Sequence, residues 1–224
     1  MHIRGKIFFM KRIYISKNAN KQLTEYVKEK GYTPVYVETE GIVPEGLSCH
    51  PDIFLCKMGV HDNSPLFFAG EKVLGMTYPD DIAYNAACTG KYFLHNLSFT
   101  DEGLLRVAKE MDMKLINVRQ GYTKCSIAVV DENSLITYDE GIVKACSRYP
   151  ELDVLKITPG HILLEGYDTG FIGGTCGRIG NELLFHGDLS AHPDFERIRE
   201  FITKRNLGVK WFPDFPLTDI GSIL

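Results

Sequence analysis

The feature that most limits the possible folds of this chain is an internal repeat. A β-rich stretch, a turn, a second β-rich stretch, a short amphipathic helix and a third β-rich stretch follow one another in residues 83–118, 124–157 and 169–212. A unit of about 35 to 45 residues cannot bury its apolar face alone, so such units stack in an array or close into a ring. The repeat therefore predicts several supersecondary units of one kind that share a core.

The two chain ends together have the pattern of one further unit that is cut in half. Residues 218–224 have the pattern of a first strand, and residues 12–37 have the pattern of a second strand, a helix and a third strand. Residues 52–58 and 66–69 have the pattern of a hairpin without a clear helix after it, which makes this the weakest unit. Pairing of the chain ends closes a five-unit ring and leaves no free sheet edge.

Capping residues predict where the helices begin and end. The first helix is expected over residues 19–30, and Gly31 fits the left-handed position after its last turn. Thr100 and Asp139 are expected to cap the helices of two later units, and Pro193 suits the first position of the longest helix.

Composition and charge favour one globular domain that spans residues 1–224. The chain is 44% hydrophobic and 24% charged, and no linker-like segment divides it. The net charge of −4 argues against a nucleic acid as the direct partner, because phosphate binding needs concentrated lysine and arginine. The apolar run of residues 7–10 is too short for a signal peptide or a membrane span. We therefore expect a cytoplasmic protein without a membrane partner.

The cysteines indicate neither a disulfide framework nor a metal site. Six cysteines without a secretory signal are typical of reduced thiols, and no pair has the CxxC spacing. Cysteine and histidine do not fall into a zinc-binding pattern, so we expect no metal and no cofactor.

Several short stretches resemble a known fold family. They are HPDI (50–53), QGYTKC (120–125), PGHI (159–162), GYDTGFIGG (166–174), GDLSAHPD (187–194) and LTDIGS (217–222). Together with the repeat, they resemble the pentein fold, also called the guanidino-group-modifying-enzyme fold, and more narrowly a bacterial family of that fold without an assigned activity. The resemblance implies a five-unit α/β-propeller of ββαβ repeats, closed by pairing of the N- and C-terminal segments. Members of the fold include deiminases, amidinotransferases and non-enzymatic ribosome anti-association factors.

Superposition of the units predicts a polar centre. The residues near the start of each first strand, which the resemblance places at the central channel, are Asp52, Asn85, Cys125, Asp168 and Asp219. Three carboxylates that converge repel one another unless a cation lies between them. A guanidinium suits such a site because it donates paired hydrogen bonds to carboxylates. The alternative is that each aspartate only caps a turn.

Cys125 is the candidate nucleophile, and His161 and His50 are the candidate proton carriers. A thiolate in this fold attacks the guanidinium carbon while a histidine transfers protons. Lys124 is a further candidate for substrate binding, although its position next to Cys125 does not by itself lower the pKa of the thiol. The alternatives are a small buried core cysteine and structural or surface histidines.

Two departures from the catalytic pattern of the family keep a second hypothesis open. Catalytic penteins carry the nucleophilic cysteine in the last unit, where residues 218–221 have none, and a histidine two residues before the aspartate, where this chain has Gly166 before Asp168. The first hypothesis is a deiminase or amidinohydrolase that acts on a small guanidino or amidino compound. The alternative is a non-catalytic protein that binds a small cationic ligand or a macromolecular partner such as the ribosome.

Overall fold

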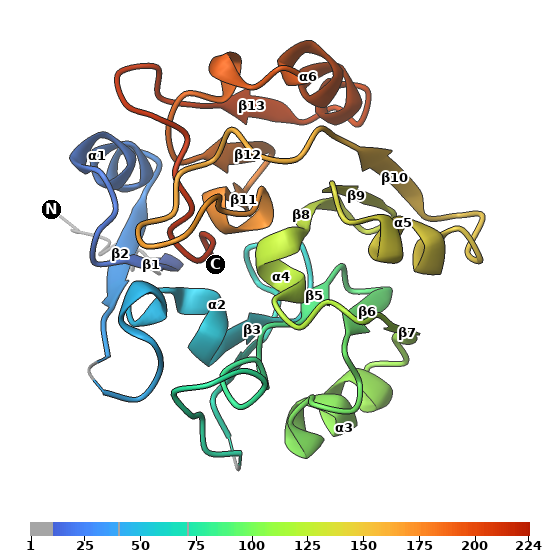
Figure 1. Cartoon of the computed structure of the whole chain (residues 1–224). Coiled ribbons are helices and arrows are strands. Elements are labelled where there is room, and N and C mark those ends of the chain that lie inside the picture. Colours follow the sequence, from blue (N-terminus) through green and yellow to red (C-terminus); the bar gives the residue numbers. More distant parts are fainter. Residues whose placement is uncertain (1–10, 40, 71) are drawn as a thin grey trace, which may run out of the picture.

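The strands of the chain form five small sheets in a mixed α/β architecture. The computed structural model describes residues 11–39, 41–70 and 72–224, so the apolar run of residues 7–10 lies outside it. Figure 1 shows the sheets in chain order around a central region, where the short helices α2 (Pro51–Phe54) and α4 (Thr123–Ser126) and the C-terminus lie. The centre is therefore made by segments that are far apart in the sequence.

Three of the sheets have three strands and confirm the predicted repeat. In each unit the first two strands pair antiparallel, and the third strand pairs parallel to the second after a helix. The first unit has β5 (Ala87–Cys88), β6 (Tyr92–His95), α3 (Glu102–Glu110) and β7 (Lys114–Asn117). The second has β8 (Ala128–Asp131), β9 (Ser134–Thr137), α5 (Glu140–Cys146) and β10 (Asp153–Lys156). The third has β11 (Cys176–Ile179), β12 (Glu182–Phe185), α6 (Phe195–Thr203) and β13 (Gly208–Lys210).

The other two sheets have two strands each. The weak unit is an antiparallel pair of β3 (Leu55–Lys57) and β4 (Leu66–Phe68). As the sequence predicts, the described residues between β4 and β5, 69–70 and 72–86, form no helix. The N-terminal unit pairs β1 (Lys11–Ser16) parallel to β2 (Tyr32–Val37) through α1 (Lys21–Glu29). Three short 3₁₀ helices complete the described elements, η1 (Glu45–Leu47), η2 (Gly173–Thr175) and η3 (Leu189–Ala191).

The C-terminal residue pairs with β1, but the tail does not form the predicted strand. The backbone of Leu224 accepts a hydrogen bond from the Tyr14 amide at 2.8 Å and donates one to the Tyr14 carbonyl at 3.0 Å. Among the described residues from Lys11 onward, the expected pairing of the two segments is limited to this one residue pair. Gly221 and Ser222 both have a φ of 72°, which interrupts the extended backbone that a strand over residues 218–224 needs.

The longer helices α3 and α6 pack their apolar residues against the sheets of their own units. Leu104 of α3 and Phe93 of β6 are fully buried in one cluster, and Ile198 of α6 and Phe185 of β12 are fully buried in another. Burial of apolar area of this kind is the main stabilising contribution to such units. The helices thus hold the strands in place, and the polar centre is left to the short segments that precede the first strands.

The predicted helix ends are mostly confirmed, with two corrections. Gly31 has a φ of 86° after α1, and the side chain of Asp139 accepts a hydrogen bond from the Ile142 amide at 2.9 Å. Thr100 does not cap α3, because its hydroxyl bonds to His95; Asp101 caps this helix instead. The last helix begins two residues after Pro193.

A membrane-spanning helix, which must be both long and apolar, does not occur in residues 11–39, 41–70 or 72–224.

Candidate functional site

Five short segments meet at the centre and are joined by hydrogen bonds into a closed ring. The bonds run from Asp52 N to Gly221 O, Asn85 Nδ2 to Asp52 O, Lys124 N to Asn85 O, Lys124 Nζ to Gly173 O, and Ser222 N to Gly174 O, at 2.8–3.2 Å. Four of these segments lead directly into a first strand, and the fifth is the tail. Polar groups that are distant in sequence are therefore brought together.

Two glycines of η2 make this close approach possible. A Cβ atom at Gly173 would lie 2.2 Å from the carbonyl oxygen of Ile127, and one at Gly174 would lie 1.9 Å from Asp219 Oδ1. Any side chain at either position would push apart the segments that build the centre. The Gly-Gly pair is thus a requirement of the site rather than a turn signal.

Asp52 and Cys125 lie in contact at the middle of the ring. The Cys125 thiol donates a hydrogen bond to Asp52 Oδ2 at 3.2 Å, and Ser222 Oγ donates to the same oxygen at 2.5 Å. Asn85 Nδ2 lies 3.2 Å from Cys125 Sγ, and its amide oxygen accepts from the backbone of residues 124 and 125. Asp52 is 0% and Cys125 2% exposed, so bulk water screens neither group.

Lys124 and Asp219 complete the charges of the centre. The Lys124 ammonium donates to Ser222 Oγ at 2.9 Å, so Ser222 links it to Asp52. Asp219 accepts backbone hydrogen bonds from Phe171 at 2.9 Å and Gly221 at 3.0 Å. His50 Nδ1 lies 3.8 Å from Asp219 Oδ1, and both side chains are buried.

Burial shifts the pKa values of the titratable groups at the centre in the direction that favours their neutral forms. It raises the pKa of Asp52, and it raises that of Asp219 to about 6. Burial, and then the charges of Asp52 and Asp219, raise the pKa of the Cys125 thiol well above its usual range. Burial lowers the pKa of His50. A cation bound among these groups would reverse the shifts of the acidic groups, because it favours their charged forms.

Two buried polar atoms of the centre, His50 Nδ1 and Asp52 Oδ1, have no hydrogen-bond partner among the residues that the structure describes. Such atoms are rare in folded proteins and cost free energy unless a ligand, ion or water satisfies them. His50, Asp52 and Cys125 also offer three ligand atoms within 4.8 Å of one another, which could hold a metal ion. The sequence predicts these three residues at the site but shows no metal-ligand spacing, because Asp52 and Cys125 are 73 residues apart.

The structure brings together six of the eight predicted site residues, His50, Asp52, Asn85, Lys124, Cys125 and Asp219. Asp168 is a correction: it is exposed in the loop after Leu164, because η2 instead of Asp168 precedes the first strand of its unit. His161 is a second correction, since it is exposed and its ring packs on His192 at 5.7 Å. Cys125 itself lies in α4, three residues before β8, rather than on a strand.

Sequence reasoning missed Ser222 and a group of aromatic side chains near the centre. Ser222 is fully buried and joins Asp52 to Lys124. The rings of Tyr122, Phe171 and Tyr138 follow one another with centroids 6.4 and 5.9 Å apart. The signal for Ser222 was its place in the tail segment, three residues after Asp219. The aromatic residues come from two units and share no sequence pattern.

The chain matches a family model over residues 14–224 and belongs to that family, which is described as a family of unknown function (DUF6873). No curated protein matches the chain. Among solved structures, the chain is similar to the agmatine deiminase of C. jejuni, with 12% sequence identity and a TM-score of 0.38. The similarity covers 56% of this chain and 49% of that protein, so the matched part spans about half of its length.

Proposed function

We propose that the chain is a five-unit α/β-propeller of the pentein type, and that its centre binds a small guanidino or amidino compound and hydrolyses one of its C–N bonds. The repeated units around a common centre support this fold. So do the closed ring of hydrogen bonds and the contact of Tyr14 with Leu224. In this account all 224 residues form one domain.

The observation that carries the proposal is the unbalanced set of polar groups around Asp52. In the part of the chain that the structure describes, two buried carboxylates face one ammonium, that of Lys124, and Asp52 Oδ1 has no hydrogen-bond partner. Burial of an unpaired charge is costly, so the centre as described favours an additional cation. A guanidinium supplies one positive charge and five N–H donors in a plane, which matches acceptors on neighbouring segments.

The aromatic group of Tyr122, Phe171 and Tyr138 gives the cation a suitable approach. The three side chains are partly exposed, and the backbone of Phe171 donates directly to Asp219. Cations bind favourably over the faces of such rings. A guanidinium that enters past these rings therefore moves from an aromatic surface to the carboxylates of the centre.

The chemistry follows from the contact between the thiol and Asp52. A bound guanidinium lowers the pKa of Cys125, and the thiol proton passes to Asp52 Oδ2 along the existing 3.2 Å contact. The thiolate forms an S–C bond with the carbon of the guanidino or amidino group, and a C–N bond breaks as the leaving nitrogen takes the proton from Asp52. Water then loses a proton to His50 and forms a C–O bond, the S–C bond breaks, and the proton on His50 returns to the thiolate. The products are ammonia or an amine, together with a urea from a guanidino compound or an amide from an amidino compound. His50, whose pKa is lowered by burial, is neutral at pH 7 and can accept a proton from this water.

A second function, cation binding without chemistry, is favoured by one observation. The free thiol is buried and its pKa is raised, whereas reactive cysteines are activated by neighbouring positive charge. If a bound cation does not lower the pKa of Cys125 enough to form the thiolate, the centre binds the cation without reacting with it.

Two readouts on a guanidino panel separate these functions. Arginine, agmatine, creatine and guanidine are each tested for a rise in melting temperature and for release of ammonia or an amine, with Cys125→Ser and a matched Cys49→Ser control. A hydrolase shows both effects, and Cys125→Ser loses only the release. A rise in melting temperature without release supports the binding module. If no compound raises the melting temperature and none releases ammonia or an amine, the proposal is refuted.

A further inference from the structure

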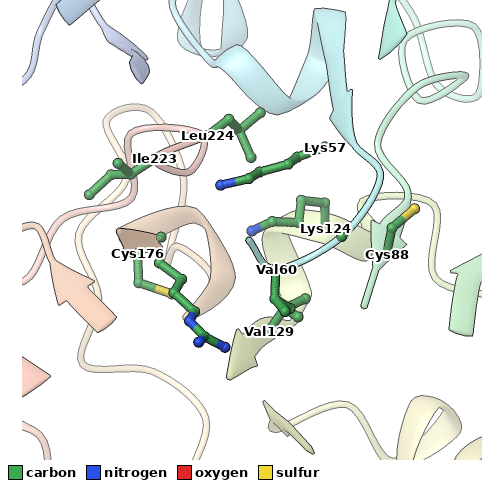
Figure 2. Close-up of a pocket in the computed structure, with 11 residues that line it drawn as sticks. Lys57, Val60, Cys88, Lys124, Val129, Cys176, Ile223 and Leu224 are labelled. Atoms are coloured by element: carbon green, nitrogen blue, oxygen red, sulfur yellow. The ribbon is translucent and has the colours of Figure 1, made fainter. Parts of the chain in front are cut away.

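A small cavity lies on another side of the centre and is lined by cationic side chains. Its volume is about 30 Å³, and Lys57, Lys124 and Arg178 are the charged residues that line it. Figure 2 shows Lys57 from β3 and Lys124 from α4 extending into the same space, beside Leu224 and Val60. The remaining lining is apolar side chains, two cysteines and two glycines.

Of the described residues, no aspartate or glutamate lines this cavity, although Lys124 also faces the carboxylates of Asp52 and Asp219 at the centre. Within residues 11–39, 41–70 and 72–224, Lys57, Lys124 and Arg178 form no ion pair. Arg178 donates to the carbonyl oxygens of Gly180 and Val130, and Lys124 donates to Gly173 O and Ser222 Oγ. Three like charges around a cavity repel one another, and the repulsion is strong where solvent is excluded.

Lys57 shows this imbalance most clearly. Burial lowers the pKa of its ammonium to about 8; Asp62 acts in the opposite direction, and Lys124 and Arg178 lower the pKa further. Asp62 is engaged elsewhere, since it accepts hydrogen bonds from Lys11, Tyr32 and the Gly180 amide. Among the residues that the structure describes, no carboxylate forms an ion pair with this largely buried ammonium.

We propose that this cavity binds a small carboxylate, held by Lys57, Lys124 and Arg178. An arginine and two lysines provide the charge-assisted donors that carboxylates prefer. The volume limits the ligand: one water-sized group needs about 10–15 Å³ on this scale, so the cavity accepts about two, the size of the two oxygens of a carboxylate. A tetrahedral oxyanion such as phosphate is larger. The carboxylate is either a free ion or the acidic end of a larger molecule, and the site does not depend on the proposed hydrolysis.

The test measures melting temperature at constant ionic strength with formate, acetate, phosphate or chloride, for the wild type, Lys57→Met and Lys144→Met. Methionine keeps the apolar stem of Lys57 and removes its charge, and Lys144 is an exposed lysine that serves as the control. We expect formate and acetate to raise the melting temperature of the wild type and of Lys144→Met. We expect Lys57→Met to be at least as stable as the wild type without anion, and to bind carboxylate at least tenfold more weakly.

A second readout, the pKa of Lys57 followed by NMR of ¹³C-methylated lysines, applies even if the thermal shifts are small. A bound carboxylate favours the charged ammonium, so acetate should raise this pKa from about 8 and chloride should not. Stabilisation by phosphate alone, an equal response of Lys57→Met and the wild type to acetate, or a Lys57 pKa that acetate does not move would each overturn the proposal.

Discussion

Replacement of Asp219 by asparagine tests whether the centre is as dry and as electrostatically isolated as the structure indicates. Burial raises the pKa of Asp219 from 3.8 to about 6, although hydrogen bonds from the backbone of Gly221 and Phe171 oppose this. Between these two pH values the folded protein holds a proton that the unfolded chain has lost. The contribution of Asp219 to stability is therefore fully present below about pH 4 and is lost as the pH rises through about 6.

The magnitude follows from this difference. Each pKa unit corresponds to about 1.4 kcal/mol, so the complete loss is about 3 kcal/mol, of which about 2 kcal/mol falls between pH 4.5 and pH 7. Asparagine does not titrate, so Asp219→Asn lacks this loss. It carries a constant cost, because an amide cannot accept both backbone hydrogen bonds, and this cost cancels when two pH values are compared. Removal of the Asp219 charge also lowers the pKa of Asp52, which acts in the same direction.

The assay is urea unfolding of both proteins at each pH, with a chelator present. We expect the free energy of unfolding of Asp219→Asn to gain about 2 kcal/mol on that of the wild type from pH 4.5 to pH 7. Asp62→Asn is the matched control. Burial acts to raise the pKa of Asp62, but hydrogen bonds from Gly180, Lys11 and Tyr32 outweigh it and lower the pKa to about 2. The difference in free energy of unfolding between Asp62→Asn and the wild type should thus stay constant above pH 4.5. If the difference in free energy of unfolding between Asp219→Asn and the wild type does not change with pH, the reasoning is refuted.

Two further substitutions test the contacts that build the centre, both by urea unfolding. Gly173→Ala places a Cβ 2.2 Å from a backbone carbonyl oxygen and should destabilise the protein by at least about 3 kcal/mol. Gly141→Ala, on the exposed start of α5, places its Cβ 3.0 Å from the Asp139 side chain and should change stability by no more than about 1 kcal/mol. Ser222→Ala removes the hydroxyl that donates to Asp52 Oδ2 and should cost about 2 kcal/mol. Ser147→Ala, at an exposed site, should cost less than about 0.5 kcal/mol. Equal effects within either pair would contradict the structure.

Much of the fold could be predicted from the sequence, because each unit of the repeat has a local pattern of apolar and capping residues. Alternating and helical periodicities, with Asp139 and Gly31 at helix ends, give the units and most of their limits. The error at Thr100 shows the limit of local signals. Two adjacent residues can both cap a helix, and a distant partner, His95, decides which one does.

The site could be predicted only where the units follow one register. Asp52, Asn85 and Cys125 come from equivalent segments, so superposition brings them together correctly. In the unit that carries Asp168, a long loop precedes the first strand, and Gly173 takes the inner position because no side chain fits there. When a backbone segment takes the place of a side chain at the centre, no residue type in the sequence indicates it. The sequence therefore could not distinguish the exposed Asp168 from a central residue.

The most direct test of a cation-activated thiol is the alkylation of Cys125 by two reagents that differ in charge. Chloroacetamidine is a cation at neutral pH, chloroacetamide is a neutral compound of nearly the same shape, and both leave a mass label on cysteine. If the carboxylates of Asp52 and Asp219 receive a cation, the first reagent should label Cys125 at least tenfold faster than the second, relative to the half-exposed Cys49 of the same molecule. An equal ratio at Cys125 and Cys49, or labelling of Cys125 only after unfolding, would contradict the account.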